Sequence, residues 1–353
     1  MPTVIRASGA AEFLALLPSM LGYRPSNSVV AVVFRHGRTC GAMRYDLSGT
    51  DPATLAMVMV GVACRIEGAD AVIPLVYTDR PYRAATAGAP SVMLGCLTQS
   101  LHEAGFGVPD AFLLAAGGWA AGMLVGESLM LPPEPEPYAR VDEARVAAPE
   151  HTVVAHPAAI AEPDRRDPRR AAAVRRARRA LELARPGAPA GSVHLPDDIA
   201  RLAQLLTGGR GRPLSPTEIA VLGSICAHPA DRDALLGSVA LGSVESLGAL
   251  GEQPRIEDLI TGGSAVPVDV GRLANAHAAF RHAIAHLPRR QRPGPLGLAG
   301  WLCWAQGQGS AAIAHLTAAL EIDPDHTLAL VLQRLVCEGR IPEWAFQPPI
   351  SDR

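Results

Sequence analysis

The first third of the chain alternates between two hydrophobic periods. Strands are predicted at 28–34, an apolar run rich in β-branched residues, and at 39–47, 70–78 and 110–118, and 119–125 is compatible with a fifth strand. Longer stretches with helical spacing predict helices at about 10–20, 52–66 and 91–104. This succession predicts an α/β domain over residues 1–130, with three layers in which helices cover a mixed sheet.

The second half of the chain carries helical spacing only. Helices are predicted from residue 169 onward, and further along at 197–206, 215–227, 268–287, 295–308, 309–322 and 326–339. We therefore expect an all-α domain over residues 191–345. The intervening residues 131–190 are rich in Pro and Arg and suit a linker followed by a basic helix, with a short strand also compatible with 151–156.

Composition narrows the classes of function. The 353 residues include no Lys, and the net charge of -2 argues against general nucleic-acid or membrane-surface binding. The Arg-rich helix lacks interleaved aromatic residues, so nucleic-acid binding ranks last. Neither a signal peptide nor a membrane-spanning run is visible, and the six Cys are scattered singly. We expect a cytoplasmic protein with reduced cysteines and no membrane association.

Motifs for cofactors and metals are missing from the sequence. There is no GxGxxG, no phosphate-binding loop with its lysine, no GxSxG and no HExxH, so no cofactor is expected. His277, His282 and His286 lie in one predicted helix, and His282 and His286 have the spacing of a metal pair. A solvated helix face explains these histidines better, and no metal site is predicted.

The corner Gly22–Ser28 between the first helix and the first strand is the candidate binding site. A turn explains its Gly, Pro, Ser and Asn residues, but it does not require Tyr23 or Arg24. Polar residues also end the next two strands. The candidate ligand-binding residues are Tyr23, Arg24, Ser26, Arg44, Asp46 and Asp79. We expect Tyr23 and Arg24 to lie near Arg44 or Asp79, although a cross-turn ion pair and an ordinary turn would also account for Arg44, Asp46 and Asp79.

The same stretch carries a family resemblance. LPSMLGYRPSNSVV at 17–30, RYDL at 44–47 and VYTD at 76–79 resemble an actinobacterial family, domain of unknown function 4192. The resemblance extends over most of the chain and implies no activity. Related proteins tend to carry a Cys-Pro-Pro-Gly-like segment after a Trp-rich strand, whereas 129–137 in this chain has no Cys.

The C-terminal helices contain one local repeat pattern. Five residues fall at the spacings of a tetratricopeptide repeat: Gly300, Ala312, Leu316, Ala319 and Pro324. This pattern predicts a tightly packed helical hairpin with Gly300 against Ala312 or Leu316. A plain hairpin that closes a helical bundle is the alternative, since only one copy is present.

These observations favour a binding or adaptor protein. Its ligand would be a small molecule, or a protein partner held by the C-terminal helices. The alternative is a hydrolase-like or nucleotide-utilising enzyme with its site at the strand ends of the N-terminal domain. In that case Arg24 and Arg44 would hold an anionic group, and a carboxylate would act as a base or metal ligand. Whether the protein is an enzyme stays open at this point.

Overall fold

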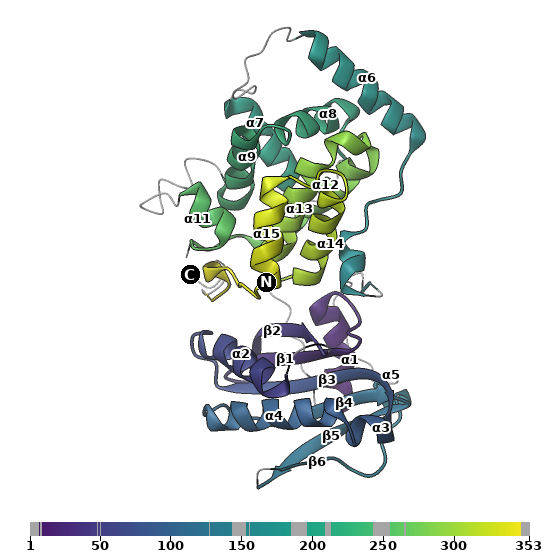
Figure 1. The fold of residues 1–353 in the computed structure, drawn as a ribbon, viewed down its shortest axis with the longest axis vertical. Helices are drawn as coiled ribbons and strands as arrows, with labels where there is room; N and C mark the ends of the chain where they lie inside the picture. The colour runs from purple at the N-terminus through teal and green to yellow at the C-terminus, as the bar shows by residue number, and fades with distance from the viewer. Residues whose placement is uncertain are drawn as a thin grey trace. The chain divides into compact units, whose positions relative to one another are not determined.

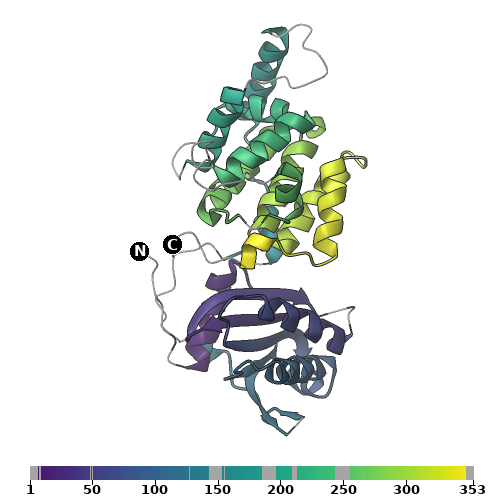
Figure 2. The same cartoon turned by 90° about the vertical axis from the view of Figure 1, so that its left-hand side faces the viewer.

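The structure, a computed structural model, forms two compact units, residues 1–157 and 158–353 (Figure 1 and Figure 2). It describes residues 7, 9–47, 49, 51–126, 128–142, 153–154, 156–184, 196–208, 213–242, 255–264 and 266–346. Within these residues no helix combines the length and the apolar character needed to cross a membrane. The three-part division expected from the sequence, 1–130, 131–190 and 191–345, stays a prediction.

The first unit is built on a six-stranded mixed sheet. Across the sheet its strands are β2 (Arg38–Asp46), β1 (Ser28–Arg35), β3 (Ala71–Pro81), β4 (Ala111–Ala116), β5 (Gly118–Val125) and β6 (Ser128–Met130). Among the described strands only β3 and β4 pair in parallel. The valines of β1 are buried because this strand lies between β2 and β3 and is covered on both faces. The predicted mixed sheet is confirmed. The sequence pattern did not predict β6, which is only three residues long.

Helices cover both faces of this sheet, as the sequence predicted. Leu14 and Leu17 of α1 (Ala10–Leu21) pack on one face, together with Val30 of β1. On the other face lie α2 (Pro52–Cys64) and α4 (Ala89–Glu103), whose apolar side chains form a separate core. The short helices α3 (Tyr82–Thr86) and α5 (Ala139–Asp142) complete the unit.

The second unit is helical, which confirms the predicted all-α region. Its helices are α6 (Pro168–Ala184), α7 (Pro196–Thr207), α8 (Pro216–Ile225), α9 (Pro229–Leu241), α11 (Ile256–Thr261), α12 (Val270–His286), α13 (Pro293–Ala305), α14 (Gly309–Leu320) and α15 (Thr327–Cys337). Single 3-10 turns lie at η1 (Pro157–Ala161), η2 (Arg289–Gln291) and η3 (Glu343–Phe346). The sequence pattern did not indicate α9, because it buries Asp231 and Arg232, which interrupt the apolar stripe.

Helix α13 is the centre of this unit. All of its residues are buried, and it packs against α12, α14 and α15 (Figure 1). Gly300 allows the close approach of α14, since a Cβ there would lie 2.7 Å from Leu316 Cδ2 and 3.4 Å from the Ala312 carbonyl oxygen. The predicted contact of Gly300 with Ala312 and Leu316 is therefore confirmed.

Candidate metal centre

The polar residues predicted to form a site at the strand ends do gather at one edge of the sheet. Ser28, the first residue of β1, pairs with Asp46 on β2 and with Tyr77 on β3. Arg44 and Asp46 lie on the same face of β2, and their side chains form an ion pair of 2.6 Å. The buried Tyr23 lies beside them. Burial raises the pKa of Tyr23, while the Arg44 cation lowers it and Asp46 raises it.

The corner itself is held by local hydrogen bonds. Asn27 adopts a positive φ of 42°, and its side-chain amide donates to the Asp79 carboxylate. In return the Asp79 backbone N–H donates to Asn27 Oδ1 at 3.1 Å. The Ser28 hydroxyl donates to the Ser26 carbonyl at 2.8 Å. These contacts explain why the turn uses the side chains of Asn27, Ser28 and Asp79, and they give Asp79 a structural partner.

Arg24 leaves the corner toward solvent, while its backbone joins a second segment. Its N–H donates to the Val154 carbonyl at 3.2 Å, next to a parallel bridge between Tyr23 and Val154. The remainder of the strand expected at 151–156 lies mostly outside the described residues. The structure thus brings Tyr23, Arg44 and Asp46 together, and it ties Asp79 to Asn27 instead. A ligand at this edge stays a prediction.

A second group of side chains, which the sequence did not indicate, converges inside the helical unit. It consists of His277 on α12, Cys303 on α13 and His315 on α14. His277 Nε2 lies 2.9 Å from His315 Nε2 and 3.3 Å from Cys303 Sγ. The three residues expose only 6%, 0% and 2% of their surface, and one potential ligand atom from each lies within 4.8 Å of the others. We call them the His–Cys–His trio.

The packing of the three helices explains why the trio forms. His277 shares the buried face of α12 with Leu273 and Phe280, which lie one turn before and one turn after it. His315 precedes Leu316, the residue that rests on Gly300 of α13. A glycine at this contact brings α14 close enough for the short Cys303 side chain to reach two imidazoles. Cys303 follows His277 by 26 positions and His315 follows it by 38, which is too far apart for a ligand-spacing motif to reveal them.

Burial sets the protonation of the trio. Burial, followed by the Arg281 cation, lowers the pKa of His277 to about 4. Burial, followed by His277 and Arg281, lowers the pKa of His315 to about 3. Burial also raises the pKa of the Cys303 thiol. At neutral pH both imidazoles are therefore uncharged and can offer a lone pair, as metal binding requires.

Hydrogen bonding alone serves this arrangement poorly. The single Nε2 atom of His277 faces both His315 Nε2 and Cys303 Sγ, yet it has either one proton or one lone pair to offer. Only one of the two contacts can be a full linear hydrogen bond. A metal ion between the three atoms would use all three lone pairs at once.

The distances also suit a metal ion. In a tetrahedral zinc site with Zn–N of about 2.0 Å and Zn–S of about 2.3 Å, two nitrogens lie about 3.3 Å apart and a nitrogen and a sulfur about 3.5 Å apart. The trio, at 2.9 Å and 3.3 Å, is a few tenths of an ångström tighter. Small side-chain rotations outward would admit the ion.

Comparison with known proteins places both sites in one family. The family model described as Domain of unknown function (DUF4192) matches residues 11–343. The chain belongs to this family. The match includes the strand-end residues and the His–Cys–His trio, so both lie within the domain that defines the family. The comparisons found no matching curated protein and no matching solved structure.

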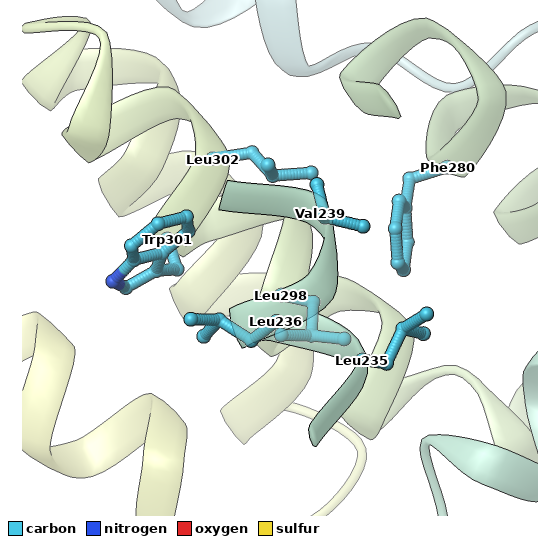
Figure 3. Close-up of a pocket in the computed structure, with 7 residues that line it drawn as sticks. All are labelled: Leu235, Leu236, Val239, Phe280, Leu298, Trp301 and Leu302. Atoms are coloured by element: carbon cyan, nitrogen blue, oxygen red, sulfur yellow. The ribbon is translucent and has the colours of Figure 1, made fainter. Parts of the chain in front are cut away.

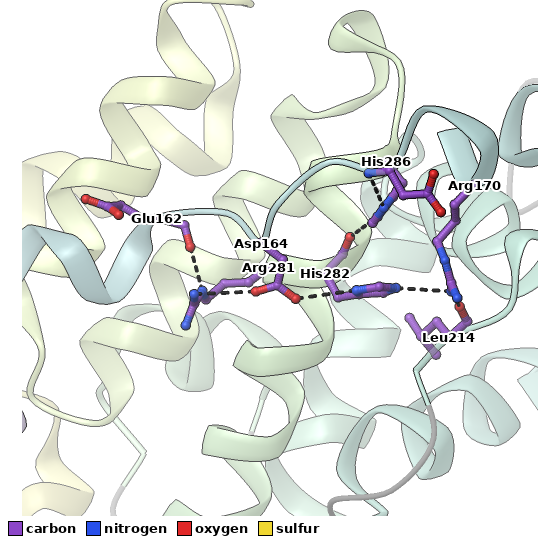
Figure 4. Close-up of polar contacts among 8 residues, drawn as sticks. Glu162, Asp164, Arg170, Leu214, Arg281, His282 and His286 are labelled. Atoms are coloured by element: carbon purple, nitrogen blue, oxygen red, sulfur yellow. Dashed lines mark hydrogen bonds and ion pairs between the residues drawn. The ribbon is translucent and has the colours of Figure 1, made fainter. Parts of the chain in front are cut away.

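The ring nitrogens of the other histidine pair in this DUF4192 chain are engaged by protein groups. His286 donates from Nδ1 to the His282 carbonyl at 2.8 Å and accepts from the Asp167 N–H at 3.2 Å. His282 lies 3.3 Å from Arg170 Nη1 and 3.4 Å from the Asp164 carboxylate (Figure 4). All four ring nitrogens thus have protein partners. The expectation of a solvated face was wrong, because residues 162–170 cover this side of α12 and His286 is buried.

The core between α9, α12 and α13 is apolar. A void of about 10 Å³ lies between α9, α12 and α13, lined by Leu235, Leu236, Val239, Phe280, Leu298, Trp301 and Leu302 (Figure 3). Its volume approaches that of one water molecule, but its lining offers no polar partner, so it stays dry. Phe280 and Leu302 belong to the same helices as His277 and Cys303, so α12 and α13 carry both apolar core residues and members of the trio.

Proposed function

We propose that this protein binds a soft transition-metal ion in its helical unit, with His277 Nε2, Cys303 Sγ and His315 Nε2 as ligands. The observation that carries the proposal is the convergence of the three ligand atoms within 4.8 Å in a fully buried site. Thiolate and imidazole are the ligands that zinc and copper prefer, and the set contains no carboxylate that would favour magnesium or calcium.

Metal binding would change the protonation of one residue. The buried Cys303 is a thiol in the metal-free protein, since burial raises its pKa. The ion must displace this proton, so uptake releases about one proton per ion and weakens as the pH falls. The two imidazoles are already neutral and release none.

The proposed role of the ion is structural. One ligand comes from each of α12, α13 and α14, so the ion would cross-link three helices of the core. An ion that binds the folded protein and not the unfolded chain stabilises the fold by mass action. We therefore expect the helical unit to melt at a higher temperature when the ion is bound.

The metal content of the purified full-length protein tests this proposal. We compare the wild type with Cys303→Ala and with Cys226→Ala, a matched control, because Cys226 is also a buried cysteine of the helical core but lies outside the trio. Mass spectrometry after extensive dialysis should find one ion per chain in the wild type and in C226A, and almost none in C303A. Equal metal content in C303A and C226A, or no uptake by the wild type, would contradict the proposal.

Several finer expectations from the sequence remain proposals of their own. They include an actinobacterial source, a cytoplasmic location, a tetratricopeptide-like hairpin and a protein partner on the C-terminal helices. A small anionic ligand at the strand ends is supported by the grouping of Tyr23, Arg44 and Asp46. The enzyme alternative is less well supported, because Asp46 and Asp79 already bind Arg44 and Asn27 and would have to give up these partners.

A further inference from the structure

The charge of the His–Cys–His trio restricts which metal it can hold. The thiolate of Cys303 supplies one negative charge, and the two imidazoles supply none. A monovalent ion therefore gives a neutral complex, whereas a divalent ion leaves one positive charge inside the protein. We infer that the ion of this site is cuprous copper rather than zinc; this inference rests on the metal-binding function proposed above.

The surroundings oppose any residual positive charge. Arg281 lies one turn after His277 on α12, and its cation acts on all three members of the trio. Its guanidinium is held by the Glu162 carbonyl at 2.6 Å and by the Asp164 carboxylate at 3.4 Å (Figure 4). Asp164 is already paired with Arg281, and the trio has no carboxylate of its own, so a divalent ion would leave one positive charge inside the protein without a counter-ion, where charge is costly.

The number of ligands leads to the same metal. Zinc takes four ligands in nearly all protein sites, and where the protein supplies three, water or hydroxide is the fourth. Hydroxide would neutralise zinc, but it needs hydrogen-bond partners of its own, and the buried residues one position or one turn from the trio on α12 and α13 include the apolar Leu273, Phe280 and Leu302. Cuprous copper is soft and needs no fourth ligand in a trigonal N₂S site.

The second unit also lacks the residue that completes electron-transfer copper sites. These sites combine two His and one Cys with a weak axial Met, yet all eight methionines of the chain lie at or before Met130. The charge argument disfavours cupric copper as it disfavours zinc. The site should therefore hold copper in the reduced form, without the visible absorption of a cupric thiolate.

Competition with indicators for each metal tests the inference on the full-length protein. The described exposed cysteines, Cys40, Cys64 and Cys337, are first replaced by Ser, because exposed thiols also capture cuprous ion. The metal-free protein is then titrated under anaerobic conditions against the cuprous–bicinchoninate complex and, in a separate experiment, against zinc bound to a zinc indicator. We expect the protein to withdraw one cuprous ion per chain and to leave zinc with its indicator. Cys303→Ala should withdraw neither, and Cys226→Ala should behave as the parent.

Each other outcome has a defined meaning. Zinc uptake that depends on Cys303, with or without cuprous uptake, overturns this inference but leaves the proposed function standing. Uptake of neither metal overturns both. Cuprous uptake that survives Cys303→Ala comes from other groups and also overturns both.

Replacement of Arg281 tests whether charge is the reason that the site disfavours zinc. Arg281→Gln removes the positive charge, so the zinc affinity should rise about tenfold or more while the cuprous affinity changes little. Arg272→Gln on the same helix is the control, since the Arg272 side chain contacts the Ser238 carbonyl and not the trio. Circular dichroism shows whether each variant is folded. Equal changes in both affinities in R281Q would refute the charge argument.

Discussion

Replacing Gly300 by Ala should destabilise the helical unit by crowding α14. The new Cβ would lie 2.7 Å from Leu316 Cδ2 and 2.8 Å from Leu316 Cγ, about 1 Å inside the optimal separation of two carbon atoms. Leu316 is completely buried and cannot turn into solvent. Overpacking of this kind costs about 1–3 kcal/mol, and the better helix propensity of Ala returns about 1 kcal/mol of it.

A control variant removes the propensity from the comparison. Gly237 lies inside α9, where a Cβ would meet only Ile256 Cδ1 at an ordinary 3.6 Å. Gly237→Ala should therefore gain helix propensity without crowding. The difference in unfolding free energy between G300A and G237A then isolates the steric cost, and we expect it to be about 1–3 kcal/mol.

Urea unfolding followed by Trp fluorescence measures this difference. Three of the four Trp residues lie in the helical unit and report on it: Trp301, Trp304 and Trp344. With a slope of about 2 kcal/mol per molar urea, the midpoints of the two variants should differ by about 0.5–1.5 M. A shift of Leu316 would also move the adjacent ligand His315 on α14, so G300A should hold the metal ion less tightly. A midpoint for G300A equal to that of G237A would show that α14 moves away without cost, and the packing argument would fail.

Three further predictions concern local contacts. His326 caps α15 by accepting from the Ala329 N–H at 3.3 Å; burial, then the Arg232 cation, lower its pKa against the opposing effect of Asp323. The folded state thus binds the proton less readily than the unfolded chain. The contribution of neutral His326 to the free energy of unfolding is therefore complete above about pH 6.5 and is lost as the pH falls. His326→Asn keeps the cap and should make the urea midpoint depend less on pH between pH 7 and 5. An unchanged pH dependence would exclude His326 as the source of this effect. Asn27→Ala breaks the paired contacts with Asp79 and should cost about 1–2 kcal/mol in thermal unfolding, whereas no loss would mean that the turn holds without them. Ser215→Ala removes the capping box of α8 and should cost about 1 kcal/mol, with Ser215→Thr restoring most of it; if both variants match the wild type, the cap contributes nothing.

The fold was largely predictable because its elements follow simple periods. The strand β1 is a run of valines, and α2 begins where Asp51 accepts from the Thr54 N–H and Pro52 occupies the first turn. Gly22 ends α1 in the left-handed conformation, as its position in the sequence indicated. By contrast, α9 was missed because tertiary contacts bury its Asp231 and Arg232, an outcome that local periodicity does not contain.

The candidate metal centre could not be predicted for a related reason. Its ligands come from three helices, and their proximity depends on how closely α14 approaches α13, which Gly300 decides. A histidine on an apolar helix face was the one available signal, and His277 and His315 both show it. The metal-type spacing of His282 and His286 was the more visible pattern. The nitrogens of both rings, however, interact with neighbouring backbone and side-chain groups.

The burial of α13 on every side also governs how this unit opens. With no face toward solvent, its amide protons can exchange, and the Cys303 thiol can be alkylated, only when the surrounding helices separate. Cys337, exposed at the end of α15, can react without such an event. Reagent labelling at Cys303 therefore reports the rare global opening of the helical unit, and bound metal should slow it by the same factor by which the ion lowers the population of the open state.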